Sequence, residues 1–167
     1  MDLRIEDVAP KLRDSRVERE LASELRKLPE ADRLQFINEL ISCGLPHCFT
    51  VALWLARTCL NDRHSLEAIL AQGLERGDAS TVKYWLEAVV HGLGFRRVVH
   101  LVSERITTDP ESVIKAEYWL RQWVPHNSQR DADAFAALQQ AVEQIVRDDP
   151  AIEKRVRPYK GLMKGSD

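Results

Sequence analysis

A near-repeat in the middle of this chain constrains its fold more than any other feature. The hexapeptide Thr-Val-Ala-Leu-Trp-Leu at residues 50–55 returns 31 positions later as Thr-Val-Lys-Tyr-Trp-Leu at residues 81–86. The tripeptide Tyr-Trp-Leu of residues 84–86 returns 34 positions later at residues 118–120. A period of roughly 30 residues is that of one helical hairpin. The repeat therefore predicts a stacked array of helical hairpins, a fold whose extended surfaces serve for binding.

Apolar residues recur at helical spacing along the whole chain, and no segment has the alternation of a strand. We expect an all-α fold of eight or nine helices, with Asp62 or Asn61, Asp78 and Asp109 as helix caps. Short connections favour antiparallel neighbours, so the expected architecture is a right-handed α-α superhelix of stacked hairpins. The expected hairpins cover residues about 30–60, 62–92 and 95–124, flanked by helices at 14–27 and 130–148.

The pattern over residues 30–124 resembles the HEAT and armadillo families of helical repeats. The first helices also correspond, as Leu34-x-x-Ile37, Leu66-x-x-Ile69 and Phe95-x-x-Val98. The resemblance implies that the second helices of successive hairpins line one concave surface. The tetratricopeptide family is the alternative, because its period is near 34 and an Asp-Pro pair often precedes its helices. Its small-residue pattern is mostly missing here, which favours the HEAT-like interpretation.

Composition places the chain among soluble globular proteins. With 44% hydrophobic and 30% charged residues, 167 residues suffice for one domain with a core of its own. We expect this domain over residues 1–153, which carry 19 basic and 25 acidic residues, and a basic tail over 154–167 with 5 basic and 1 acidic residue. No segment reaches the roughly 20 apolar residues of a membrane span. The acidic start and the odd number of cysteines, three, favour the cytoplasm, because free thiols suit a reducing compartment.

Three tryptophans mark the expected core. Trp54, Trp85 and Trp119 lie beside leucines in the apolar stripes of their helices, so we expect all three to be buried in equivalent positions. The residues one position earlier are Leu53, Tyr84 and Tyr118. One step around a helix is about 100°, so these residues should lie at the edge of the core.

A partner-binding patch is predicted from that edge position. Tyr84 and Tyr118 are followed three residues later by Glu87 and Arg121 on the same helical faces. Aromatic residues beside arginine are enriched where protein interfaces concentrate their binding energy. Tyr84, Glu87, Tyr118 and Arg121 are therefore the predicted partner-binding residues, and an ordinary solvated face is the alternative.

No motif of comparable quality points to catalysis, a cofactor or a metal. The cysteines and histidines of residues 43–64 are clustered in sequence, but Cys43 and His47 lie near the start of the expected helix at 47–60, and Cys59 and His64 lie at its end. The two groups would be nearly 20 Å apart at ~1.5 Å per residue. Buried thiols and histidines in turns therefore fit better than a zinc site. The sequence predicts a protein without enzymatic activity, cofactor or bound metal.

The leading hypothesis is a cytoplasmic scaffold that binds a protein or peptide through the face of its second helices. The alternative is a HEAT-like protein that binds nucleic acid. It could resemble the DNA glycosylases of that fold, for which Arg57, Arg96, Arg97 and Arg121 are available, or it could bind RNA or DNA through the tail. The cations of the tail could also bind an acidic partner. These cations are Lys154, Arg155, Arg157, Lys160 and Lys164. A monomer is expected, or a weak homo-oligomer that associates through Trp123 and the helix at 130–148.

Overall fold

The structure is a computed structural model that describes residues 4–124, 128–152 and 154–155. Within these residues the fold is all-helical, with 80% helix and no strand, so the all-α prediction is confirmed. None of the described helices has the length and apolar character that crossing a membrane requires.

The helices follow the expected order closely, with one addition at the start. The short helix α1 precedes the first expected helix. It was not predicted, because four residues are too few to display a helical period. Counting the helical residues after α9, the described part of the chain contains ten helices, where eight or nine were expected. The labelled elements are α1 (Ile5–Val8), η1 (Ala9–Lys11), α2 (Ser15–Leu25), α3 (Glu30–Ser42), α4 (Pro46–Cys59), α5 (Arg63–Arg76), α6 (Val82–Leu93), α7 (Phe95–Ser103), α8 (Pro110–Leu120), η2 (Arg121–Trp123) and α9 (Gln129–Asp148).

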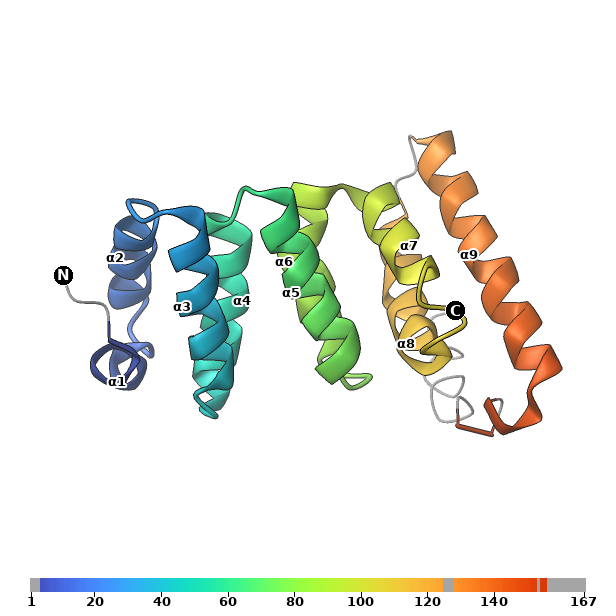
Figure 1. Cartoon of the computed structure of the whole chain (residues 1–167), viewed down its shortest axis with the longest axis horizontal. Coiled ribbons are helices and arrows are strands. Elements are labelled where there is room, and N and C mark those ends of the chain that lie inside the picture. Colours follow the sequence, from blue (N-terminus) through green and yellow to red (C-terminus); the bar gives the residue numbers. More distant parts are fainter. Residues whose placement is uncertain (1–3, 125–127, 153, 156–167) are drawn as a thin grey trace.

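Figure 1 shows these helices side by side in chain order, from α1 and α2 at one end to α9 at the other. The most extensive contacts join α3 to α4 and α5 to α6. The second helices also contact one another in succession, α2 with α4, α4 with α6 and α6 with α8. The last helix, α9, packs against both α7 and α8. The core therefore runs along the whole row of helices, between the first and second helices.

Two of the predicted helix caps are present. The Asp62 carboxylate accepts the backbone N–H of Ser65 at 2.9 Å at the start of α5. The Asp109 carboxylate accepts the N–H of Ser112 at 3.2 Å at the start of α8. Each bond satisfies a donor that the first helical turn leaves without a partner.

The prediction that Asp78 caps the next helix is wrong. Helix α6 begins only at Val82, and its N-cap residue Thr81 makes no capping bond through its side chain. The Asp78 carboxylate instead accepts the backbone N–H and hydroxyl groups of Ser80 and Thr81, at 2.7–2.9 Å. These four donors lie within three residues of Asp78, so a hydrogen-bonded turn forms ahead of the helix.

The turn between α4 and α5 is held by the first helical turn of α3. Glu30 Oε1 accepts the backbone N–H groups of Asn61 and Asp62 at 2.8 and 2.9 Å. The Arg33 guanidinium pairs with Glu30 at 3.1 Å and also donates to carbonyl groups at the ends of α2 and α4. These carbonyls belong to Arg26, Leu28 and Cys59, at 3.2, 2.8 and 2.8 Å. Three helix ends and one turn are thus joined at a single ion pair.

The three repeated tryptophans are not equivalent, which corrects the prediction that all three are core residues. Trp85 is 2% exposed, lies directly over Gly73 of α5 and packs edge-on against Phe49, with ring centroids 5.5 Å apart. Trp54 is 36% exposed. Trp119 is half-buried at the margin of the core. The tryptophans of the repeated motif therefore differ in how deeply they are buried.

The packing of α4 explains why Trp54 lies outside the core. Helix α4 contacts α2, α3 and α6 and buries small side chains together with Val51, Leu53 and Leu55. These residues occupy the faces of α4 that meet its three neighbours. Trp54 therefore lies on the remaining arc of α4, which faces solvent. The buried small residues of α4 are Cys48, Ala52, Ala56 and Cys59.

Candidate partner-binding surface

The second helices of neighbouring pairs turn adjoining faces to solvent. Trp54 of α4 and Tyr84 of α6 are 36% and 42% exposed, two of the three large hydrophobic side chains that are exposed in the described chain. Arg57 follows Trp54 by three residues and His91 follows Tyr84 by seven, so each pair shares a helical face. Arg57 Nη2 and His91 Nε2 are 2.7 Å apart, and they join the two faces. We call these faces, with that of α8, the second-helix surface.

A cation between aromatic rings connects the α6 and α8 parts of this surface. The Lys83 ammonium lies 4.7 Å from the centroid of the Tyr84 ring and 5.1 Å from that of the Trp119 ring. Trp119 in turn packs edge-on against Tyr118, with centroids 5.0 Å apart. Such cation–π contacts contribute roughly 0.5–1 kcal/mol at exposed sites. The structure therefore links the predicted residues Tyr84 and Tyr118 through Lys83 and Trp119, which were not among the predicted partner-binding residues.

The turn at residues 78–81 fixes the position of this cluster. The Trp119 indole donates from Nε1 to the backbone carbonyl of Ala79 at 2.9 Å. Hydrogen bonds from Ser80, together with those from Thr81, lower the pKa of Asp78 to about 2, against a small opposing effect of burial. The carboxylate form therefore holds the turn, and through Ala79 the turn holds Trp119.

Arg121 has a structural partner that limits what else it can bind. Its guanidinium donates from Nε and Nη2 to Glu117 Oε1, at 3.2 and 2.8 Å. The Glu117 side chain is only 2% exposed, whereas that of Arg121 is 51% exposed. A buried carboxylate needs such a partner, because an unpaired charge in the core is costly. Arg121 therefore neutralises a buried acid, while Glu87, the fourth predicted residue, is exposed on α6 one turn after Tyr84.

Leu53 does not lie at the edge of the core, contrary to the prediction. It is 4% exposed, and the next residue, Trp54, takes the exposed position on α4. The register of α4 is thus rotated relative to that of α6, where Tyr84 is exposed and Trp85 is buried. Trp54, the exposed aromatic residue of the first helix pair, was therefore not among the residues predicted for the partner-binding patch.

The remaining sequence candidates contribute less to a site. Lys154 and Arg155 of the basic tail are exposed. The other predicted tail residues, Arg157, Lys160 and Lys164, lie outside the described residues. Trp123 is half-buried against the core, and α9 buries its apolar stripe of Phe135, Leu138 and Val142 within the chain, against α7 and α8. The surface expected to support a homo-oligomer is thus largely occupied by the chain itself.

The two buried thiols of α4, those of Cys48 and Cys59, contact backbone carbonyl groups of the preceding elements. Cys48 Sγ donates to the carbonyl of Ala9 at 4.0 Å, and Cys59 Sγ donates to that of Ala22 at 3.6 Å. These contacts fasten α4 to η1 and α2. Among the described residues, no three His, Cys, Asp or Glu side chains are grouped so that they could hold a metal ion.

Comparison with known proteins adds no relative: no protein-family model, curated protein or solved structure matches this chain.

Proposed function

We propose that this chain is a non-enzymatic helical-repeat scaffold that binds a protein or peptide through its second-helix surface. In this proposal the helix pairs form a right-handed superhelix of the HEAT and armadillo kind. The contacts between helices support it. Helix α4 packs closely against α6, whereas the first helices α3 and α5 touch only lightly. Helices on the inner side of a curved array are the closer ones, so the second helices fit a concave lining.

The contact chain from Tyr84 through Lys83 and Trp119 to Tyr118 carries the proposal. It gathers three aromatic rings and one cation from two successive second helices. Trp54 is a further exposed ring on a third second helix, α4. Aromatic residues bring large contact area at low conformational entropy, and they dominate interface energies. An ordinary solvated helix face would instead present long charged side chains.

Site-specific photocrosslinking tests the proposal without knowledge of the partner. A benzophenone amino acid replaces Tyr84, and the purified chain is irradiated in cell extract before mass spectrometry. The matched control carries the same amino acid at Glu75, which is exposed on the first helix of the same pair. We expect discrete adducts from position 84 and none from position 75. Equal adducts from both positions, or none from position 84, would contradict the proposal.

Point variants then show which side chains bind. Trp54→Ala and Tyr84→Ala remove exposed rings and should weaken formation of the adduct from a crosslinker at position 87 while helix content is unchanged. Arg121 is unsuitable for this purpose, because its replacement leaves the buried Glu117 carboxylate without its partner. Loss of binding in such a variant would therefore reflect loss of stability as well as loss of contact.

Nucleic-acid binding, the alternative from the sequence, gains less support. Of the four arginines considered for it, Arg97 pairs with Glu67 at 2.8 Å and Arg121 pairs with Glu117. Arg57 contacts His91. A duplex-binding surface needs cations spread along one face to meet successive phosphates, whereas these four arginines come from α4, α7 and η2, and residues 1–153 have a net charge of −6. Salt-dependent shifts of a duplex in a gel at low ionic strength would favour this alternative over the scaffold.

A further inference from the structure

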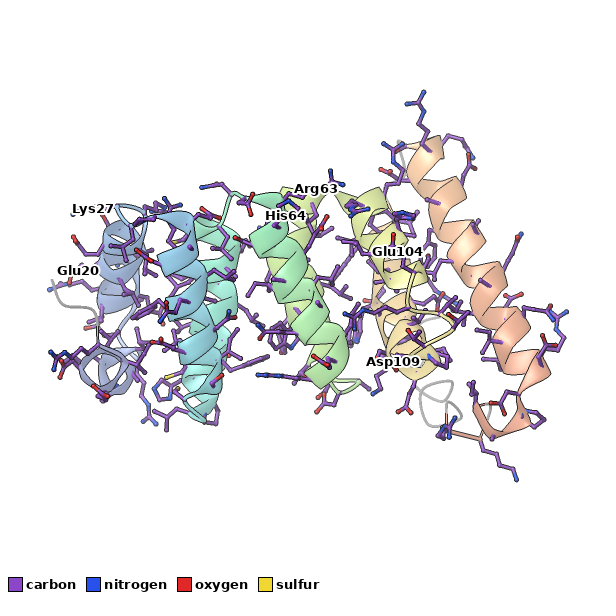
Figure 2. The ribbon with its side chains drawn as sticks, in the orientation of Figure 1. Glu20, Lys27, Arg63, His64, Glu104 and Asp109 are labelled. Carbon is purple, nitrogen blue, oxygen red and sulfur yellow. The ribbon has the colours of Figure 1, made fainter. Side chains whose placement is uncertain are left out.

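A cleft of about 960 Å³ is lined by none of the residues named above for the second-helix surface. It is formed by the start of α5, the turn between α6 and α7, the exposed side of α7 and the first half of α9. Figure 2 shows Arg63 at the upper edge of the molecule, at the start of α5. The charged or titratable side chains that line it are Arg63, Arg96, Arg97, His100 and Asp131.

Two of the arginines are brought together by one carboxylate. Glu67 Oε1 accepts from Arg63 Nε at 3.0 Å and from Arg97 Nη2 at 2.8 Å. The two guanidinium groups therefore lie within about 6 Å of each other. The hydrogen bonds from Arg97, and next those from Arg63, lower the pKa of Glu67 although burial opposes them. At this wall of the cleft one negative charge thus faces two positive charges.

The cleft retains donors that the protein itself does not use. Arg63 contacts Glu67 through Nε, so in the described structure its terminal amino groups have no hydrogen-bond partner. Arg96 is exposed and makes no hydrogen bond or ion pair to another described residue. Asp131 on α9 is the acid in the lining, and His100 is bound to Glu104 at 3.1 Å. Among the lining residues themselves, three arginines face one carboxylate, that of Asp131, while Glu67 and Glu104 lie outside the lining.

The other walls of the cleft are apolar. They come from the turn after α6, from α7 and from α9, and they include Leu93, Phe95, Val99, Ala134 and Ala137. Pockets for small organic molecules measure roughly 300–1,000 Å³ and combine an apolar lining with a few convergent polar groups. The cleft matches that description in size, and its lining is divided about equally between polar and apolar surface.

We propose that this cleft binds a small organic phosphate monoester, with the phosphate held by Arg63, Arg96 and Arg97. A phosphate presents three terminal oxygens and up to two negative charges, whereas a carboxylate presents two oxygens and one charge. Arg63 and Arg96 keep their terminal amino groups for phosphate oxygens, whereas Arg97, whose Nε and Nη2 both bond Glu67, keeps only Nη1. The organic part of the ligand then lies against the apolar walls. This inference does not rest on the proposed scaffold function.

Titration with simple phosphates tests the site. Adenosine monophosphate, glucose 6-phosphate, inorganic phosphate and adenosine are each added to the full chain, and binding is followed by calorimetry and by amide NMR shifts. We expect saturable binding of both esters with a Kd of about 1 mM or tighter, with the largest shifts at residues 63 and 92–97. Inorganic phosphate should bind the same residues more weakly, and adenosine should not bind.

A charge-matched pair of double variants distinguishes a site from general attraction. Arg63→Gln with Arg96→Gln should weaken binding of the esters at least tenfold, while Arg97 still pairs with Glu67 and preserves the fold, as circular dichroism would verify. Arg76→Gln with Arg147→Gln removes the same charge from exposed positions outside the cleft and should leave binding unchanged. Equal losses in both double variants, binding of inorganic phosphate as tight as that of the esters, or no saturable binding at about 10 mM ester would overturn the proposal.

Discussion

Replacement of Gly73 by alanine tests how α5 and α6 fit together. A Cβ atom at position 73 would meet three side-chain atoms of Trp85, its Cβ, its Cγ at 2.5 Å and its Cδ2 at 2.8 Å. Carbon atoms in contact normally lie about 3.5–4.0 Å apart. Because the Cβ of Trp85 is among the atoms met, rotation of the ring cannot relieve the clash. The two helices would have to separate by about 1 Å.

The magnitude follows from two opposing effects. Alanine favours an internal helical position over glycine by about 1 kcal/mol. Overpacking of a close helix contact costs about 3 kcal/mol, at the upper end of the usual range, because backbone must move. We therefore expect Gly73→Ala to lower the free energy of unfolding by about 2 kcal/mol. With a urea m value of about 2 kcal/mol per molar, the midpoint should fall by about 1 M.

Gly92→Ala supplies the matched control. Position 92 is exposed on α6, and a Cβ there would meet only the Cδ1 atom of Leu66, while other atoms of that side chain are at least 3.7 Å away. Rotation of the Leu66 side chain away from its preferred torsion angle costs about 0.5–1.5 kcal/mol. This cost offsets the gain in helix propensity. Its urea midpoint, measured by circular dichroism and tryptophan fluorescence, should stay close to that of the wild type. If Gly73→Ala unfolds at or above the wild-type midpoint, the close approach of α5 and α6 is refuted.

Three further predictions concern burial and ionisation. Trp85→Ala should lower the free energy of unfolding by about 3–5 kcal/mol and Trp54→Ala by less than about 1 kcal/mol; similar urea midpoints for the two variants would contradict their different burial. The folded-state pKa of Asp78 lies below its ordinary value of 3.8, so its contribution to stability should be complete above pH 3.8 and disappear as the pH falls toward about 2. Asp78→Asn should thus be less stable than the wild type at pH 6 and approach it at pH 2 in urea titrations; a constant difference would refute this. Burial, with a smaller effect of Cys43, raises the pKa of Cys48 to about 12, so iodoacetamide at pH 8 should modify the half-buried Cys43 well before Cys48, as peptide mass mapping would show.

The repeated motif predicted the helices but not the direction in which each tryptophan points. Neighbours three and four positions away on a helix share its face, and they distinguish the three cases. Around Trp54 three of these four neighbours are polar, around Trp119 two, and around Trp85 one. Trp54 is exposed, Trp119 is half-buried and Trp85 is buried, in the same order. Attention to these neighbours, rather than to the motif alone, would have placed Trp54 on the surface.

Other parts of the structure depend on contacts that the sequence alone does not reveal. Helix pairs could be located because helical period and capping residues are local properties, as at Asp62 and Asp109. Gly73 carries no signal of this kind, since only the packing of α6 shows why a side chain is excluded there. Lys83 is likewise an ordinary helix residue until α8 places Trp119 beside it. The partner-binding candidates were thus recognised in part, and the residues that connect them required the packed helices.

The ion pair of Glu30 and Arg33 has a mechanical consequence. A turn between helix pairs is where a repeat array would be expected to flex, yet both backbone N–H groups of the turn at residues 61–62 are bound to Glu30. Flexing at this turn would break charge-assisted hydrogen bonds and also the three carbonyl contacts of Arg33. The amide protons of Asn61 and Asp62 should therefore exchange with solvent slowly for residues in a turn. We therefore expect helices α2 to α5 to move as one rigid unit. A partner bound along α4 would then keep a fixed orientation relative to the start of α5.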